Sequence, residues 1–403
     1  MTDYRKTSTI LPSGTANQNL SDVAGARVAW LLPTIRSGPY WQPFLAEFAR
    51  LFPRTTLFTG GWGGYLPGFE DAFRVRSLGR HHHLHIPFLE GTSPGYEGVN
   101  WASPVAFREL RRFRPDVIFV SAFGLWTLLA LLYRGMSKSR VIVVLDGVSE
   151  STAYRHSLRL PLRRAMARRL DAAVCNSEVG CAYLRDDLLM DSSRVYHRRF
   201  YVPDVRTLRA GSDAEPAGSE PGLPSFLFSG RIIARKGWRC LLDAAHLLRQ
   251  RGRGDFLVAM VGDGPEMPQL RQRVCELGLE ANFAIAGSVP YCELGAYFAA
   301  ASVLILPSLE DTWGMVVSEA MALGKAVLCS RAAGASELIR DGEEGYVFDP
   351  EDSAALAGQM EKLLSTPGLA RAMGRQAALT MASQTPRLAA LSVGEVAARV
   401  LRP

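Results

Sequence analysis

The stretch Leu304–Ser330, LILPSLEDTWGMVVSEAMALGKAVLCS, decides the fold of this chain. Residues 303–306 form a short apolar run that ends at a proline, which is typical of a buried strand. From Gly314 to Leu323 the apolar side chains recur at helical spacing, and the glycine that follows can end a helix. Residues 326–329 predict a second buried strand. The stretch is therefore expected to form a strand, a polar loop, a helix and a strand.

Two acidic residues of this unit lie where its chemistry is expected. Ligands of open α/β sheets bind at the carboxyl ends of the strands, and a helix N-terminus there suits a phosphate. Asp311 lies in the polar loop and Glu319 lies two turns into the helix. Near a phosphate such carboxylates are useful if they accept hydrogen bonds from sugar hydroxyls. Taken alone, the stretch is equally consistent with an acidic loop and a solvated glutamate.

The same alternation of strands and helices is expected along the rest of the chain. Predicted strands are 27–32, 55–59, 116–121, 141–145 and 172–176 in the first half, and 226–229, 256–261 and 283–286 in the second. Predicted helices are 40–51, 104–113, 125–134, 158–170, 238–248 and 267–277. Alternation of this kind predicts parallel, doubly wound sheets in an α/β protein.

A segment rich in glycine, proline, serine and acid, 206–224, is expected to link two domains. We expect a disordered N-terminus over 1–25, a Rossmann-like domain over 26–205 and a second one over 225–384. A last helix, about 385–403, is long enough to cross back and pack on the first domain. The cleft between two such domains is the expected ligand site.

The positive charge of the chain is uneven. The net charge is +7, but residues 1–205 hold 26 Lys and Arg against 17 Asp and Glu, whereas the remainder holds 20 against 22. A basic first half favours an anionic partner: membrane lipid, a diphosphate-linked acceptor or nucleic acid. The basic helix between Arg155 and Arg169 fits either an anionic membrane surface or a core helix with a solvated face.

Several features argue against other classes of protein. Residues 1–19 are polar and lack the apolar core of a signal peptide, and no apolar run is long enough to span a bilayer. The six cysteines form no CxxC pair, which excludes common zinc and disulfide frameworks and suits a reducing cytosol. The histidines 81–83 and 85 have no companion acid or cysteine at ligand spacing, so a metal site is not expected.

Two glycine-containing loops follow the first strands of the second half. The loop SGRIIARKG, Ser229–Gly237, carries Arg231 and Lys236, a planar fork and a point charge that together suit a diphosphate. Gly230, and Gly262 in the next turn VGDGP, let the backbone approach a ligand closely. The alternative is two solvated surface cations and an ordinary tight turn.

Four motifs taken together resemble a known family. SGRIIARKG, VGDGP, PSLEDTWGMVVSEAMALGKAV and GASELIRDGEEGYVF resemble the C-terminal domain of retaining glycosyltransferases of glycosyltransferase family four. The resemblance is dense over 226–349 and extends to the first half in architecture alone. It implies the GT-B fold, in which two doubly wound Rossmann-like domains face across a cleft, with the acceptor in the first and the donor in the second.

The resemblance implies roles for individual residues. Arg231 and Lys236 would hold the donor diphosphate and stabilise the leaving group, and Glu319 would bind the donor ribose. Asp311 stands where the family has the first glutamate of its E-x7-E motif, and it is shorter by one methylene. The family's donor identity and affinity therefore do not carry over to this position.

The resemblance also implies roles for several backbone groups and acceptor-side residues. Backbone groups that would face the donor sugar, phosphate or base belong to Gly314, Met315, Val316 and Val289. Ser37 and Gly38 fall on the acceptor loop, and Asp146 takes the place of a histidine near the donor sugar, or else is a turn residue or helix cap. Family members need no metal, so neither metal nor cofactor is expected.

The activity implied is transfer, with retention, from a UDP- or GDP-sugar to a saccharide or lipid-linked acceptor. The product would be a cell-surface polysaccharide or glycolipid, made in the cytoplasm or on the inner face of the membrane. The alternatives are a sugar-nucleotide epimerase or phosphorylase of the same fold, and a non-catalytic scaffold that binds membrane or, less favoured, nucleic acid.

Overall fold

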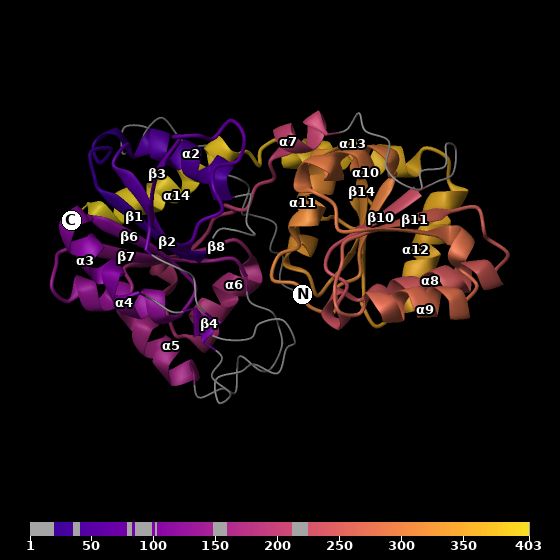
Figure 1. The fold of residues 1–403 in the computed structure, drawn as a ribbon, viewed down its shortest axis with the longest axis horizontal. Helices are drawn as coiled ribbons and strands as arrows, with labels where there is room; N and C mark the ends of the chain where they lie inside the picture. The colour runs from indigo at the N-terminus through magenta and orange to yellow at the C-terminus, as the bar shows by residue number, and fades with distance from the viewer. Residues whose placement is uncertain are drawn as a thin grey trace. The chain divides into compact units, whose positions relative to one another are not determined.

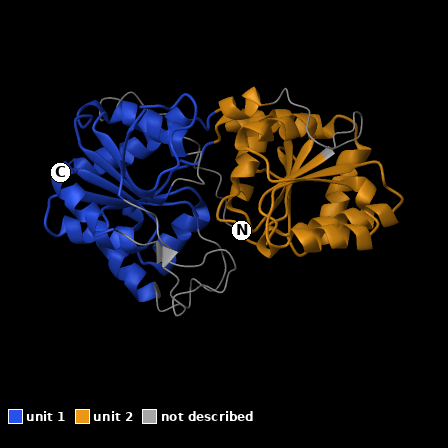
Figure 2. Ribbon diagram, viewed as in Figure 1, with its two compact units in different colours: residues 1–202, 383–403 blue, residues 203–382 orange. Residues whose placement is uncertain are grey.

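The chain folds into two compact units (Figure 2): residues 1–202 with 383–403 form unit 1, and residues 203–382 form unit 2. The structure, a computed structural model, describes residues 20–34, 41–78, 83–84, 99–100, 103–147, 159–211 and 225–402. No helix in this part of the chain is both long and apolar enough to cross a bilayer.

Unit 1 is built on a parallel sheet of seven strands in the order β3-β2-β1-β6-β7-β8-β9. The strands are β1 (Val28–Thr34), β2 (Thr55–Gly61), β3 (Arg74–Ser77), β6 (Val117–Ser121), β7 (Arg140–Leu145), β8 (Ala172–Cys175) and β9 (Val195–His197). The central strands are continuous apolar runs because helices cover both of their faces. A separate antiparallel pair joins β4 (His83–Leu84) to β5 (Val99–Asn100).

Helices cover the two faces of this sheet (Figure 1). On one side lie α3 (Pro104–Phe113), α4 (Leu125–Arg134) and α5 (Arg159–Arg168), and on the other α2 (Trp41–Leu51) and α14 (Pro386–Leu401). The C-terminal helix α14 packs against α2, close enough that a Cβ on Gly394 would lie 3.3 Å from the ring of Phe52.

Side chains of β1 alternate between these two layers, as the period of a strand requires. Ala29 and Leu31 join the apolar cluster under α3 and α4. Trp30 points to the other face, where its ring meets Phe44 of α2 edge-to-face at 5.5 Å and stacks on Phe119 at 4.2 Å. These contacts place the first strand at the centre of the unit.

Unit 2 is built on a parallel sheet of six strands in the order β12-β11-β10-β13-β14-β15. The strands are β10 (Ser225–Ser229), β11 (Leu257–Val261), β12 (Phe283–Gly287), β13 (Val303–Leu306), β14 (Ala326–Ser330) and β15 (Gly345–Phe348). The chain winds outward from β10 in one direction and from β13 in the other. The boundary between β10 and β13 is therefore a topological switch point, where ligands bind in open sheets.

Helices also cover both faces of the second sheet (Figure 1). One face is covered by α8 (Trp238–Gln250), α9 (Met267–Glu276) and α12 (Ser353–Ser365), whose apolar side chains join the main core cluster. The other face carries α10 (Leu294–Ala300), α11 (Met315–Ala322) and α13 (Leu369–Met381). The alternation of strands and helices predicted parallel, doubly wound sheets in an α/β protein, and this prediction is confirmed.

The predicted elements are present, and their bounds differ from the predictions by two residues at most. The segment proposed as a linker differs: its first residues form the helix α7 (Val205–Ala210), which belongs to unit 2. Asp204 begins this helix, since its carboxylate accepts hydrogen bonds from the backbone N–H and the hydroxyl of Thr207. Residues 212–224 lie outside the described part of the chain.

Candidate active site

Loops that leave β10, β11 and β13 meet at the carboxyl edge of the unit 2 sheet. The backbone N–H of Gly230 donates to the carbonyl of Val261 at 2.9 Å, and a Cβ on Gly262 would lie 1.9 Å from the Gly230 oxygen. Gly262 also has a φ of +132°, which favours glycine. Only glycine fits there, so the VGDGP turn and the loop after β10 pack directly on each other.

The structure brings Lys236 and Asp311 together. Lys236 ends a single 3-10 turn, and its Nζ lies 2.5 Å from Oδ2 of Asp311. Both side chains are largely buried, with exposed fractions of 16% and 10%. The turn can approach the loop after β13 because its next residue is Gly237 (φ +67°). A Cβ at this position would lie 1.8 Å from the carbonyl oxygen of Pro307. Lys236 is thus already paired with an acid, which the sequence did not indicate.

Arg231 has a different environment. Its side chain is exposed, and its guanidinium makes no hydrogen bond or ion pair with any residue that the structure describes. Arg231 leaves the carboxyl end of β10 at the switch point, where a bound anion is expected. In contrast to Lys236, Arg231 is therefore available to a ligand without first breaking an ion pair with a described residue.

Glu266, which was not predicted as a site residue, holds the cationic loop in place. Its Oε1 accepts a hydrogen bond from the backbone N–H of Ala234 at 2.8 Å, and its Oε2 accepts from the indole of Trp238 at 3.0 Å and from Arg239 at 2.8 Å. The sequence feature that could have identified Glu266 is its position directly after the VGDGP turn. Glu266 thus positions the turn that carries Lys236.

Replacing Glu266 by alanine should weaken donor binding about tenfold and lower the melting temperature, because the buried indole of Trp238, the backbone N–H of Ala234 and Arg239 lose their acceptor. The measurement is a nucleotide titration by calorimetry together with a thermal melt. Glu351→Ala, on an exposed residue of the same unit, is the matched control. Equal binding by both variants would show that the Glu266 bonds do not position the site.

Glu319 lies in the second turn of α11 and is 6% exposed. Its Oε1 accepts a hydrogen bond from the hydroxyl of Tyr291 at 2.9 Å. Burial raises the pKa of Glu319 to about 7; the Tyr291 hydrogen bond opposes this shift and the charge of Asp204 adds to it. Burial, followed by the charge of Glu319, raises the pKa of Tyr291. Tyr291 and Asp204 were not predicted from the sequence.

The first turn of α11 presents backbone donors. Gly314 begins the helix with a φ of +92°, and a Cβ there would lie 2.6 Å from Leu306. The N–H groups of Met315 and Val316 belong to the first helical turn, which has no intrahelical acceptor. Both residues are half-exposed, so these groups can face a ligand.

Two further donor-site positions lie on the same edge. Val289 follows β12 and is half-exposed. Glu310, which precedes Asp311 in the same loop, has a buried Oε1 without a hydrogen-bond partner in the described structure. A buried carboxylate oxygen without a donor is a candidate acceptor for a ligand hydroxyl.

In unit 1, Asp146 lies directly after β7, at the carboxyl edge of that sheet. Burial raises its pKa to about 6, and a hydrogen bond from the Tyr201 side chain partly opposes this shift. The other oxygen, Oδ1, is buried and has no partner among the described residues. Tyr201 is held in turn by Asn176, whose Oδ1 accepts its backbone N–H at 3.0 Å. Asp146 therefore keeps one oxygen available for a ligand hydroxyl.

The basic helix α5 fits the core-helix interpretation better than the membrane interpretation. Arg163 donates to the hydroxyl of Tyr183 at 2.9 Å, and Arg164 donates to the carbonyl of Asp187 at 2.7 Å. Both arginines thus tie α5 to the segment after α6 (Glu178–Ala182). On its outer surface the helix keeps Leu162 and Arg168 exposed.

Some sequence-derived candidates lie outside the described residues: Ser37, Gly38, His81, His82, His85 and Arg155. His83 lies in β4, but its side chain is also outside the description. Among the residues that are described, no group of three or more His, Cys, Asp or Glu is placed to hold a metal ion.

Comparison with known proteins relates this chain to a family. The family described as glycosyl transferases group 1 matches residues 212–380. D-inositol 3-phosphate glycosyltransferase of Pseudarthrobacter chlorophenolicus is 35% identical over 165 residues, which cover 40% of this chain and only 39% of that protein. The 2-deoxystreptamine glucosyltransferase of Streptomyces kanamyceticus is 28% identical over 311 residues, which cover 70% of this chain and 78% of that protein.

Solved structures show the same fold. Alr3699/HepE of Anabaena, solved in complex with UDP and glucose, superposes with a TM-score of 0.68 over 91% of this chain and 97% of its own, at 17% sequence identity. The match thus extends over both units, although the sequence match is concentrated in unit 2. Residues 212–380 therefore match the glycosyl transferases group 1 family, and the chain has the GT-B fold.

Proposed function

We propose that this protein is a retaining glycosyltransferase that moves a sugar from a UDP- or GDP-linked donor to a saccharide or lipid-linked acceptor. The observation that carries this proposal is the carboxyl edge of the unit 2 sheet. There the loop after β10 carries an exposed Arg231, which has no partner among the described residues, and a Lys236 held by Asp311. The helix α11, which carries the buried Glu319, begins after β13 at the same edge. Cations and backbone donors suit a diphosphate, and buried carboxylates suit sugar hydroxyls.

The cations stabilise the departing diphosphate. In the reaction the bond from the anomeric carbon to the diphosphate oxygen breaks, and the acceptor hydroxyl bonds to the same face of that carbon. The hydroxyl proton passes to the departing phosphate oxygen. Negative charge grows on the diphosphate, so Arg231, Lys236 and the N–H groups of Met315 and Val316 act where the charge develops.

Lys236 can serve the phosphate without losing Asp311. An ammonium group has three N–H donors, so one bond to Asp311 leaves two for phosphate oxygens. Asp311 thereby holds the ammonium in position, and the ordering of this side chain is complete before the donor arrives. In this assignment Asp311 positions Lys236, and the unpartnered oxygen of Glu310 is available to a donor hydroxyl.

The acceptor is assigned only by class. The names of the two relatives refer to inositol 3-phosphate and to 2-deoxystreptamine, which are different hydroxylated rings. Asp146 offers an unpartnered buried oxygen to a sugar hydroxyl. The net charge of +9 over residues 1–205 supports a lipid-linked acceptor and peripheral contact with an anionic membrane. The cysteines of the described chain are free, which supports a reducing cytosol as its location.

A thermal-shift panel tests the donor site. UDP, GDP, ADP, CMP and their sugars are added without metal, since a ligand that binds only the folded protein stabilises it by about 2.7 kcal/mol at a hundred times its Kd. One selective nucleotide should raise the melting temperature, and Arg231→Ala with Lys236→Ala should abolish the shift. No shift from any nucleotide at millimolar concentration would remove the basis of the proposal.

Donor binding should depend on the protonation of Glu319. Its pKa of about 7 means that the carboxylate, which accepts ribose hydroxyls, is lost as the pH falls. When protonation of a group with a pKa of about 7 blocks binding, the Kd rises about tenfold as the pH falls from 8 to 6. Tyr291→Phe removes the bond that lowers this pKa, so the weakening should begin at a higher pH than in the wild type.

Calorimetric titrations of the selected nucleotide from pH 6 to pH 8 measure this effect. Glu319→Gln cannot titrate, so any remaining pH dependence in that variant belongs to the nucleotide itself and is subtracted. Tyr346→Phe, elsewhere in unit 2, is the matched control for the lost hydroxyl. Wild-type and Glu319→Gln curves of the same shape would contradict the role given to Glu319.

A further inference from the structure

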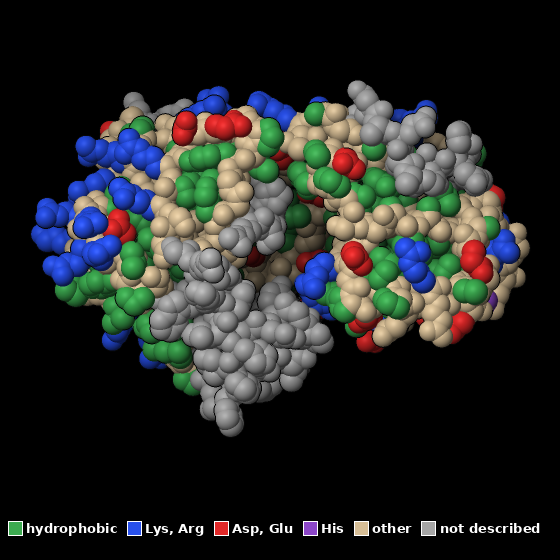
Figure 3. All heavy atoms as spheres, viewed as in Figure 1, with side chains coloured by type: hydrophobic (Ala, Val, Ile, Leu, Met, Phe, Trp, Pro, Cys, Tyr) green, Lys and Arg blue, Asp and Glu red, His purple; other side chains and the backbone are tan. Residues whose placement is uncertain are grey.

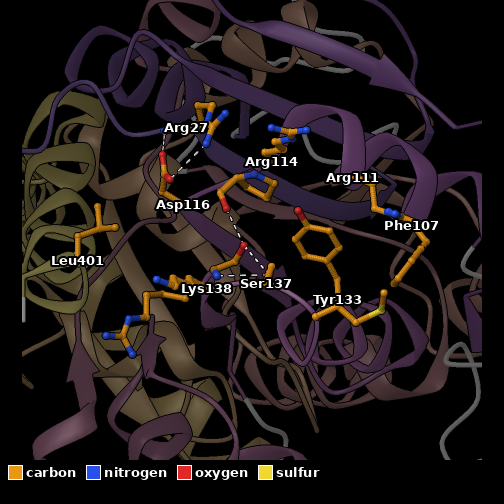
Figure 4. A pocket seen from close by; sticks show the side chains of 13 residues that line it. Arg27, Phe107, Arg111, Arg114, Asp116, Tyr133, Ser137, Lys138 and Leu401 are labelled. Carbon is orange, nitrogen blue, oxygen red and sulfur yellow. Dashed lines mark hydrogen bonds and ion pairs between the residues drawn. The ribbon is translucent and has the colours of Figure 1, made fainter.

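A cavity of about 600 Å³ lies at the amino edge of the unit 1 sheet (Figure 4). Its lining includes Arg27 before β1, Asp116 before β6 and Ser139 before β7, together with the ends of α3, α4 and α14. Asp146 lies at the carboxyl edge of the same sheet, so the cavity is distinct from the acceptor-side position described above. Its volume is in the range of small-molecule sites.

The lining is strongly basic. Five cations face one acid, and they are Arg27, Arg111, Arg114, Lys138 and Arg140. The acid, Asp116, is engaged by Arg27, through the backbone N–H at 2.8 Å and the guanidinium at 3.6 Å. Arg140 lies 3.3 Å from Asp171. Two of the five cations are thus already paired.

The other three cations are uncompensated. The side chains of Arg111, Arg114 and Lys138 are exposed and make no hydrogen bond or ion pair with the residues described here. The C-termini of α3 and α4 lie beside them, and each helix end carries about half a negative charge. Two helix ends therefore offset about one of the three charges, and an excess of about two positive charges remains for a ligand.

The geometry is that of a recess with cations around aromatic and hydroxyl groups. Figure 4 shows Tyr133 and Ser137 near the middle of the view, with Arg111 and Arg114 on one side and Lys138 on the other. Phe107 supports the Tyr133 ring edge-to-face at 5.9 Å. Guanidinium forks and an ammonium group are the side chains that bind phosphate oxygens most effectively.

Arg114 lies in a backbone conformation that favours glycine. It ends α3 with a φ of +51° and a ψ of +62°, in the left-handed region, and its N–H caps the carbonyl of Leu110. Glycine is the usual residue at this position of a helix end. An arginine here adds a cation to the cavity at a conformational cost, which makes Arg114 a useful site for a test.

We propose that this cavity binds a phosphate monoester or diphosphate, carried either by a free phosphorylated molecule or by the headgroup of an anionic lipid. The site does not depend on the donor site in unit 2 or on the proposed transferase activity. Both sources share the phosphate that Arg111, Arg114 and Lys138 would bind, and the experiment below distinguishes them.

The test uses the full-length protein with Arg231→Ala and Lys236→Ala, so that the donor site does not bind the anion. Inorganic pyrophosphate is titrated by calorimetry at 0.15 M salt. One site is expected, and adding Arg114→Gly with Lys138→Ala should weaken it about tenfold or more, since bonds to charged groups are lost. Arg114→Gly relieves the backbone, so the melting temperature should not fall.

The control removes two charges elsewhere. Arg371→Ala with Arg375→Ala takes two exposed cations from α13 in unit 2 and should leave pyrophosphate binding unchanged. Equal weakening by both pairs would mean that only net charge matters and would overturn the proposal. Absence of pyrophosphate binding in the parent protein would also overturn it, whatever happens to the donor site.

Vesicles distinguish the two sources. The same proteins are sedimented with phosphatidylcholine vesicles with and without phosphatidylglycerol. Binding that needs phosphatidylglycerol, falls in the Arg114→Gly, Lys138→Ala protein and is displaced by pyrophosphate identifies a lipid headgroup. Pyrophosphate binding with no vesicle binding identifies a free phosphorylated molecule. Vesicle binding that neither the variant nor pyrophosphate changes would contradict the site.

Discussion

Replacing Arg231 by alanine should lower kcat/KM about 10²- to 10³-fold while leaving the melting temperature unchanged. The effect on rate is large because a preorganised cation at a developing charge is worth that factor. The effect on stability is small because the side chain is exposed and makes no hydrogen bond or ion pair with the described residues. The rate is measured as release of nucleoside diphosphate from the donor that the thermal-shift panel selects.

The matched control is Arg271→Ala, an exposed arginine of α9 in the same unit. It removes the same charge from unit 2 but not from the carboxyl edge, and its kcat/KM should equal that of the wild type. An Arg231→Ala enzyme with near-normal kcat/KM would contradict the proposal that this residue stabilises the departing diphosphate. A comparable loss in Arg271→Ala would attribute the effect to overall charge.

Replacing Lys236 by alanine should both inactivate and destabilise the protein. It removes a cation from the diphosphate site and leaves Asp311, of which 10% is exposed, without its partner. Breaking a buried pair by removing one side costs about 3 kcal/mol or more. The free energy of unfolding and kcat/KM should therefore fall together, in contrast to the Arg231 variant.

A double variant separates the two losses. Lys236→Ala with Asp311→Ala removes both charges, so no unpaired charge remains buried and most of the stability should return. Activity should not return, because the cation at the phosphate is still missing. Recovery of activity in the double variant would show that Lys236 serves only to neutralise Asp311. Chemical denaturation and the diphosphate-release assay measure the two quantities.

The strands and helices could be predicted well because their signals are local. Apolar runs ended by breakers predicted β13 and β14, and helical spacing predicted α8 and α11, because both sheets are buried on both faces. The two edge strands of the unit 1 sheet, β3 and β9, were not predicted. The side chains of β3 are mostly exposed and those of β9 are half-exposed, so their sequences lack the apolar run that marks a central strand.

The sequence also predicted which loops meet at the candidate donor site. Loops after parallel strands of one sheet meet at its carboxyl edge, so Arg231, Lys236, Asp311 and Glu319 were expected near one another. What each side chain binds in the folded protein could not be predicted. Lys236 and Asp311 are 75 residues apart in the chain, and Glu319 and Tyr291 are 28 apart.

Periodicity and loop composition were therefore enough to predict the α/β fold, the order of its elements and the sheet edge of the candidate donor site. The folded structure was needed to show that Lys236 pairs with Asp311 while Arg231 has no partner among the described residues, and that Tyr291 donates to Glu319. It was also needed to show that three cations without a partner in the described part of the chain line a cavity in unit 1. The physical reason is that charge pairing and burial depend on distances between residues that are remote in the chain.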